Sequence, residues 1–150
     1  MLTKEKIIEA VIAAIGEQEI FLVDILLLPD NHITVFLDSM DGLTIEQCSY
    51  ISRTMQPMLD KHSDEYLLDV SSPGLDMPLR HPAQYLKNKG RMISVLLHSG
   101  TRIDGKLSEL NDGSIIVNTE VKKKNGKKKY VEQVQHTISI SDIKTTKLIL

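Results

Sequence analysis

The chain has 150 residues, of which 41% are hydrophobic and 25% are charged, and its formal net charge is −2. These fractions are close to the averages of folded soluble domains, so they exclude a chain that is mainly disordered. Residues 1–82 hold five Lys or Arg against fourteen Asp or Glu, a net charge of −9, and residues 83–150 hold thirteen against six, a net charge of +7, which predicts an acidic domain followed by a basic domain that could bind a polyanion.

The first predicted element is a helix that begins after Thr3 and ends near Gly16. Its apolar positions recur at intervals of three and four and predict one buried face: Ile7, Ile8, Val11, Ile12 and Ile15. Residues 20–28 then read as a buried strand, and residues 33–38 alternate between apolar and polar. The Pro-Asp-Asn turn at 29–31 joins them, so we expect a β-hairpin.

A second helix is predicted after Thr44, because Gln47 three residues later completes a capping box. The apolar side of this helix is formed by Ile45, Cys48, Ile51, Met55 and Leu59. Pro57 lacks an amide hydrogen, which predicts a kink or an early helix end near it. With a third strand at 65–70, the order αββαβ predicts an antiparallel hairpin plus one strand, with two helices on one face of the sheet.

The connection between the domains is expected at 73–82, which contains three prolines and one glycine. A short helical turn at 83–89 is followed by five predicted strands, at 91–98, 102–110, 114–120, 129–135 and within 143–150. The fold class is therefore α+β. An αββαβ domain with a three-stranded sheet at 1–82 precedes an SH3-like or Sm-like five-stranded β-barrel at 83–150.

A run of lysines is the least usual local feature of the basic domain. Six of them surround an Asn-Gly pair: Lys122, Lys123, Lys124, Lys127, Lys128 and Lys129. Asn and Gly tolerate the positive φ of a two-residue turn, which would place the lysines on the arms of an exposed hairpin. Two interpretations stay open: the lysines bind the phosphates of a nucleic acid, or they form a solvated surface that prevents edge aggregation.

Catalytic and cofactor chemistry find little support in the residues. Ser71 and Ser72 lie in no G-x-S-x-G motif, which argues against a nucleophilic serine. The five histidines are scattered, and neither a G-x-x-x-x-G-K-[ST] nor a G-x-G-x-x-G motif occurs. We therefore expect no enzyme activity, no cofactor, no metal and no small-molecule substrate.

The cellular compartment is suggested by three features of the sequence: its cysteine content, its N-terminal pattern and its most apolar stretch. Cys48 is the single cysteine, so an internal disulfide is impossible, and its place on an apolar helix face favours an inert thiol. The sequence begins without a secretory signal pattern. Its most apolar stretch, at 20–28, is interrupted by Asp24 and is far shorter than the roughly 20 residues that a bilayer requires. We expect a cytoplasmic protein with no membrane partner.

Two segments carry a family resemblance. Residues 69–79 read D-V-S-S-P-G-L-D-M-P-L, and residues 42–53 read G-L-T-I-E-Q-C-S-Y-I-S-R. Together with the glycine at the end of 87–90 and the closing I-S-I-S-D-I at 138–143, they closely resemble the bacterial ribosome maturation factor RimP family. The resemblance covers the length of the chain and both predicted domains.

The resemblance implies a non-enzymatic monomer that binds the immature 30S particle and assists rearrangement of its rRNA and late-joining proteins. The implied partners are the small ribosomal subunit, its rRNA and small-subunit ribosomal protein twelve. The implied contact residues of the turn motif are Ser71, Ser72, Pro73, Gly74, Leu75, Asp76, Pro78, Leu79 and Arg80. Acidic residues of the first domain could attract a basic protein while the barrel approaches RNA, or the opposite charges could attract the two domains to each other.

Two positions depart from the family pattern. Met77 stands where the family usually has Arg, with Arg80 as the nearest cation, and Asp69 stands where Glu is common. The alternative function is a free-standing Sm-like RNA-binding protein that acts on messenger or regulatory RNA. Co-sedimentation with small-subunit particles would distinguish the two functions.

Overall fold

The computed structural model describes residues 2–63 and 65–150. The chain divides between Gly74 and Leu75 into two compact units, residues 1–74 and 75–150, which are described separately below. This division lies inside the proline-containing segment 73–82. With this boundary the first unit holds four Lys or Arg against thirteen Asp or Glu, and the second holds fourteen against seven, so the net charges are again −9 and +7.

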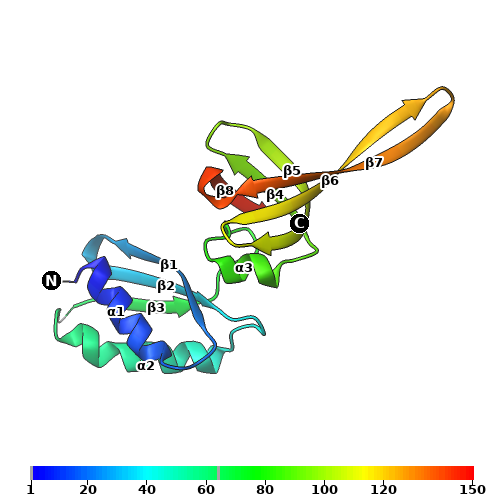
Figure 1. Ribbon diagram of the computed structural model, residues 1–150. Coiled ribbons are helices and arrows are strands. Elements are labelled where there is room, and N and C mark those ends of the chain that lie inside the picture. Colours follow the sequence, from blue (N-terminus) through cyan, green and yellow to red (C-terminus); the bar gives the residue numbers. More distant parts are fainter. Residues whose placement is uncertain (1, 64) are drawn as a thin grey trace. The chain divides into compact units, whose positions relative to one another are not determined.

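The first unit has the predicted order of two helices and three strands (Figure 1). Its elements are α1 (Lys4–Ile15), β1 (Phe21–Leu28), the short 3-10 helix η1 (Pro29–Asn31), β2 (His32–Asp38), α2 (Ile45–Asp60) and β3 (Leu67–Ser71). The sheet order is β1-β2-β3, with β2 antiparallel to β1 and parallel to β3. The predicted hairpin is confirmed, and α2 provides the crossover that a parallel pair requires.

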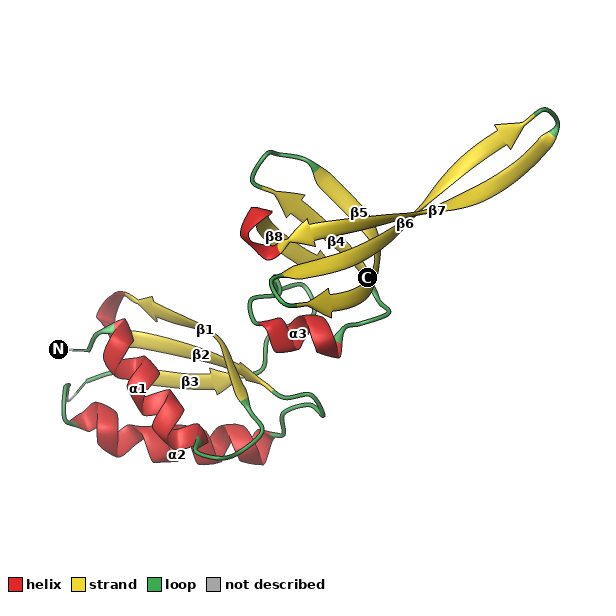
Figure 2. Cartoon of the chain, viewed as in Figure 1, coloured by secondary structure: helices red, strands yellow, loops and turns green. Residues whose placement is uncertain are grey.

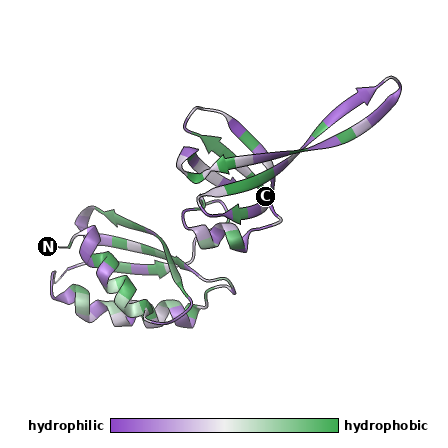
Figure 3. Cartoon of the chain, in the orientation of Figure 1, coloured by the Kyte–Doolittle hydropathy of each residue, from purple (hydrophilic) through white to green (hydrophobic). Residues whose placement is uncertain are grey.

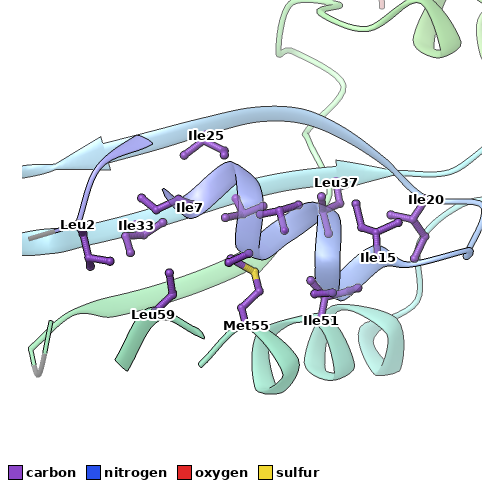
Figure 4. Packing of buried hydrophobic residues seen from close by; sticks show 14 residues of the cluster. Leu2, Ile7, Ile15, Ile20, Ile25, Ile33, Leu37, Ile51, Met55 and Leu59 are labelled. Carbon is purple, nitrogen blue, oxygen red and sulfur yellow. The ribbon is translucent and has the colours of Figure 1, made fainter. Parts of the chain in front are cut away.

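Both helices pack on the same face of this sheet, as predicted (Figure 4). The strand β2 alternates as its sequence indicates, with Ile33, Val35 and Leu37 fully buried. Ile7 from α1 and Met55 from α2 meet them in one core. The caps are also as predicted: the Thr3 hydroxyl accepts from the Lys6 amide, and Thr44 and Gln47 form a capping box.

Two expectations about burial in the first unit, for the end of β1 and for Ile12, were wrong. Leu26, Leu27 and Leu28 at the end of β1 are 41%, 38% and 46% exposed, because β1 is an edge strand and helices cover one face of the sheet only. Ile12 is 61% exposed, since it is about 100° around the helix from the fully buried Val11.

The face of α2 also differs from the prediction. Ile51, Met55 and Leu59 are fully buried, but Ile45 is 82% exposed and Cys48 is half-buried. At about 100° per residue from Ile51, Met55 and Leu59 lie at roughly 40° and 80°, Cys48 at roughly 60° and Ile45 at roughly 120°. Cys48 is thus on the buried stripe and Ile45 near its edge, but both are in the first turn of α2, before the part of the helix that packs on the core. The helix does not end early at Pro57 but continues to Asp60.

The second unit begins with a short helix and continues as an antiparallel sheet (Figure 2). Its elements are α3 (Pro82–Lys87), β4 (Met92–Leu97), β5 (Arg102–Asn111), β6 (Ser114–Asn125), β7 (Lys128–Ser139), the 3-10 helix η2 (Ile140–Asp142) and β8 (Ile143–Leu148). The strand order is β7-β6-β5-β4-β8, and every neighbouring pair is antiparallel. The α+β class and the five strands are confirmed, and closure of the sheet into a barrel stays a prediction.

The core of the second unit is built mainly from branched aliphatic residues of the sheet. Ile93, Val95, Ile115 and Val117 are fully buried, and Tyr85 of α3 packs against the same cluster. The strands β6 and β7 reach well beyond this core, and their paired ends form a long two-stranded ribbon (Figure 1).

The ribbon is longer than the sequence suggested, and its turn is displaced by one residue. Asn125 pairs with Lys128, so Gly126 and Lys127 are the central turn residues instead of Asn125 and Gly126. Gly126 has a φ of 65°, and Asn125 and Lys127 are not among the described residues with positive φ. A glycine at the first central position is typical of a type II′ turn, which needs positive φ there alone.

Gly105, in the middle of β5, predicts a local stability test. An added Cβ would lie 2.5 Å from the backbone oxygen of Asn118 and 2.8 Å from Cγ1 of Val117. We expect Gly105→Ala to destabilise the second unit by about 1–3 kcal/mol, because the neighbouring strand would have to move. Urea unfolding followed by circular dichroism measures the loss, with the exposed Thr101→Ala as the control; equal midpoints for the two variants would contradict the packing described here.

Candidate functional site

A groove of about 590 Å³ lies in the first unit between the N-terminal half of α2 and the edge strand β3. Its lining comes from two stretches of chain: Leu43, Thr44, Ile45, Cys48, Ser49, Ser52 and Arg53, and Leu68, Asp69, Val70, Ser71 and Ser72. These stretches lie within or beside the segments 42–53 and 69–79 that carry the family resemblance. The parallel pairing of β3 with β2, through the crossover α2, brings the two segments together.

Apolar side chains form much of the groove. Leu43, Leu68 and Val70 are half-buried and also pack against the core of the unit, so their positions are fixed by the fold. Ile45 is held at the start of α2 by the Thr44 capping box, and it presents most of its side chain to solvent. An isoleucine that is 82% exposed at a groove is an apolar contact that a partner could cover.

The charged residues of the groove have opposite signs. Arg53 is exposed and has no carboxylate at ion-pair distance among the described residues. Asp69, on β3, is held by His32 of β2, whose Nε2 lies 2.9 Å from its Oδ2. The groove therefore offers a basic group, an anchored carboxylate and apolar surface within a unit whose net charge is strongly negative.

Cys48 gives this groove a chemical reporter. Burial raises the pKa of its thiol above the ordinary value, against a smaller opposing effect of a backbone hydrogen bond. Because the thiolate is the reactive form, alkylation at pH 8 should be slower than for a free thiol such as glutathione and should increase as pH rises towards the raised pKa. A stopped-flow assay with a thiol-reactive dye measures this rate, with urea-unfolded protein as the control; a native rate equal to the unfolded rate would show an unshielded thiol.

Tyr66 ties the chain before β3 to the end of α2. Its hydroxyl donates to Oδ1 of Asp60 at 2.7 Å, and the carbonyl oxygen of Gln56 lies 3.2 Å away. Burial, together with the nearby Asp60 carboxylate, raises the pKa of Tyr66 to about 12. This contact fixes the start of the strand that forms one wall of the groove.

The residues of the turn motif, 71–80, differ in how far they are buried. Ser71 and Ser72 are exposed and line the groove, and the Ser71 hydroxyl donates to the Ser72 carbonyl. The rest of its exposed members are Gly74, Leu75, Asp76 and Arg80, and Pro73 and Pro78 are half-buried. Leu79 is instead buried in the core of the second unit, where its amide donates to the carbonyl of Thr146.

The residues after the turn are ordered by the start of α3. Gln84 Oε1 accepts from the backbone amides of Arg80 and His81, and His81 Nδ1 accepts from the Ala83 amide. Burial lowers the pKa of His81, which favours the neutral ring that this cap requires. Met77 is half-buried.

The second candidate surface is the end of the β6–β7 ribbon, here called the lysine hairpin and defined as residues 121–132. Its cross-strand pairs place Lys122 opposite Val131, Lys123 opposite Tyr130 and Lys124 opposite Lys129. Because neighbouring residues of a strand point to opposite faces, the lysines are distributed over both faces of the ribbon. The hairpin is mostly hydrophilic along its outer part (Figure 3).

Few acidic groups offset this charge. Lys123 Nζ lies 2.5 Å from Oε2 of Glu132, and Glu120 accepts a hydrogen bond from Gln133 nearer the core. Lys124 and Lys129 are directly opposite each other, an arrangement in which like charges destabilise a strand pair. An anion bound at the tip would relieve that repulsion.

The lysine hairpin is not purely polar. Val121, Tyr130 and Val131 are 39%, 46% and 53% exposed. A hollow of about 540 Å³ at this surface is lined by Lys122, Lys123, Lys124, Lys129, Tyr130 and Val131. The sequence indicated the lysines but did not indicate that an aromatic ring and two valines lie among them.

Neither a metal centre nor a membrane span is found in the part of the chain that the structure describes. Within residues 2–63 and 65–150, no group of three or more His, Cys, Asp or Glu is arranged to hold a metal ion. None of the described helices has the length and apolar character required to cross a membrane.

Sequence comparisons with known proteins cover both units. The model of the RimP N-terminal domain family matches residues 7–76. The ribosome maturation factor RimP of Porphyromonas gingivalis is 33% identical over 146 residues, which cover 96% of each chain. The protein of the same name from Flavobacterium psychrophilum is 33% identical over 144 residues, which cover 94% of this chain and 92% of that protein. The one from Cytophaga hutchinsonii is 34% identical over 124 residues, which cover 76% of this chain and 74% of that protein.

Proposed function

The chain belongs to the RimP family of ribosome maturation factors, and from this membership we propose that it acts in assembly of the small ribosomal subunit. In this proposal it binds the immature 30S particle and assists rearrangement of rRNA and ribosomal proteins. The observation that carries the proposal is similarity to ribosome maturation factors along 96% of the chain, which includes both units.

The charges of the two units support a division of labour. The second unit, with a net charge of +7, would contact rRNA through the lysine hairpin. Lysines on both faces of an extended ribbon can reach phosphates on two sides, and each contact releases condensed counterions. RNA phosphates would also relieve the repulsion between Lys124 and Lys129.

The first unit would contact a basic protein, which we propose to be small-subunit ribosomal protein twelve. Its net charge of −9 favours approach of a cationic surface and disfavours approach of RNA. The groove beside β3 would supply the short-range contacts, with Ile45 as an apolar contact and Asp69 as a carboxylate. Ser71 and Ser72 at the end of β3, and Gly74 after them, would extend this surface within the first unit.

We further propose that the protein acts as a monomer in the cytoplasm, without a cofactor and without catalysis. The hydroxyl of Ser71 is engaged by the neighbouring backbone carbonyl, which suits a turn better than a nucleophile. The apolar and charged groups of the groove are those of a binding surface.

Gradient sedimentation tests the proposed function. Purified protein is added to immature small-subunit particles, mature small subunits and large subunits, and each mixture is separated on sucrose. We expect co-sedimentation with the immature small-subunit particles and little with large subunits. Protein that stays at the top of every gradient but binds messenger RNA would support the Sm-like alternative and contradict the proposal.

A further inference from the structure

The two aromatic residues of the second unit have contrasting surroundings. The chain has six aromatic residues, and Tyr85 and Tyr130 are the ones that belong to residues 75–150. Tyr85 is 5% exposed, and its hydroxyl donates to Thr146 Oγ1 at 2.8 Å inside the core. Tyr130 is 46% exposed on the lysine hairpin, and within the described residues no hydrogen bond or ring contact engages its side chain. The ring of Tyr85 therefore packs in the core, and the ring of Tyr130 is accessible to a binding partner.

Two lysines share the face of the ribbon on which Tyr130 lies. Lys123 is directly opposite Tyr130, and Lys128, two residues along the strand towards the tip, shares its face. Glu132 is two residues away in the other direction and pairs with Lys123. Alternate residues of a strand are about 6.7 Å apart, so ring and ammonium groups are within reach of a single nucleotide unit.

We propose that Tyr130 is a stacking platform for an unpaired RNA base, so that the lysine hairpin binds single-stranded or bulged RNA in preference to a continuous duplex. This inference rests on the proposed contact of the hairpin with rRNA. Lysines at the tip would hold the phosphates on either side of the base. Glu132 would keep phosphates from the inner part of the ribbon and thus place the base over Tyr130.

The preference for unpaired RNA follows from which surfaces each form exposes. In an A-form duplex the bases are stacked on one another, and side chains cannot read its deep, narrow major groove. An unpaired base offers its face to an aromatic ring, and such stacking is tolerant of sequence because every base has a π-face. Lysines alone would bind both forms of RNA, since both carry phosphates.

The test compares two substitutions at Tyr130 in the full-length protein. Tyr130→Phe keeps the ring, and Tyr130→Val removes it but retains a residue that favours strands. Binding to a labelled uridine-rich single-stranded RNA and to a fully paired RNA duplex of equal length is followed by fluorescence anisotropy. We expect Tyr130→Val to weaken single-strand binding about 5- to 150-fold with little effect on the duplex, and Tyr130→Phe to bind as wild type.

The outcomes separate this inference from the proposed function. Wild-type affinity of Tyr130→Val for single-stranded RNA would overturn the stacking role, and so would equal losses for single strand and duplex. If the variant with all six lysines changed to glutamine bound RNA as well as wild type, the RNA contact itself would fail. Unchanged circular dichroism and melting of Tyr130→Val exclude unfolding as the cause of a loss.

Discussion

Changing Lys122, Lys123, Lys124, Lys127, Lys128 and Lys129 to glutamine should weaken binding to small-subunit particles and flatten its dependence on salt. Each phosphate contact contributes about 0.7–0.9 to the slope of log affinity against log salt concentration, so the slope should fall by that amount for every lysine in contact. Affinity should fall most at low salt, where screening is weakest. A salt titration of particle binding by wild-type and variant protein measures both effects.

A matched control distinguishes the hairpin from net charge in general. The second unit also carries exposed cations away from the hairpin, including Lys87, Arg91, Arg102, Lys106, Lys144 and Lys147. A variant in which these six are replaced by glutamine loses the same charge and should retain more of the salt slope than the hairpin variant. Equal slopes for wild-type and hairpin variant would mean that the six lysines are only solvated surface.

Ile51→Ala should destabilise the first unit by about 2–5 kcal/mol, because it leaves a cavity where a fully buried side chain packs between α2 and the sheet. Ile45→Ala on the same helix should change the free energy of unfolding by less than about 0.5 kcal/mol, because Ile45 is 82% exposed. Urea unfolding followed by circular dichroism measures both. The two variants remove the same atoms from the same helix.

Comparable losses of unfolding free energy for Ile45→Ala and Ile51→Ala would mean that both side chains are buried, as the sequence suggested. That result would contradict the structure. If Ile45 instead contacts the proposed protein partner, Ile45→Ala should weaken binding of the basic ribosomal protein while stability is unchanged. That combination separates a binding residue from a packing residue.

The elements of the first unit were largely predictable because their signals are local. Thr3, and Thr44 with Gln47, cap their helices through bonds that span three residues, and the alternation of β2 reports its buried face directly. Burial at Leu26 or Ile45 was not predictable in the same way. It depends on which face of the sheet the helices cover and on where along α2 the packing on the core begins.

The lysines were expected on the arms of a hairpin, but the predicted strands 114–120 and 129–135 were too short. Lysine is depleted in strands, so the run at 122–124 gave no strand signal. Cross-strand pairing nevertheless continues from Glu120 with Gln133 to Asn125 with Lys128, and Gly126 closes the turn. The register of this ladder, rather than propensity, determines that Tyr130 is opposite Lys123.

The groove could not be predicted as a site, although most of its residues stand out in the sequence. Segments 42–53 and 69–79 carry the family resemblance, but only the parallel pairing of β2 with β3 places them side by side. Similarly, Leu79 belongs to the same turn motif as Ser71 and Ser72 but is buried in the second unit. A continuous motif can thus combine exposed groove residues with buried core residues.

Chemical footprinting of rRNA in immature small-subunit particles tests the central claim most directly. We predict that the wild-type protein protects nucleotides of small-subunit rRNA, and that a subset of these protections disappears when the six hairpin lysines are changed to glutamine. Tyr130→Val should reduce protection at unpaired nucleotides and leave the other protections unchanged, which would mark the stacking contact. Absence of any protection on small-subunit rRNA by protein that binds other RNA would contradict the proposed role in small-subunit assembly.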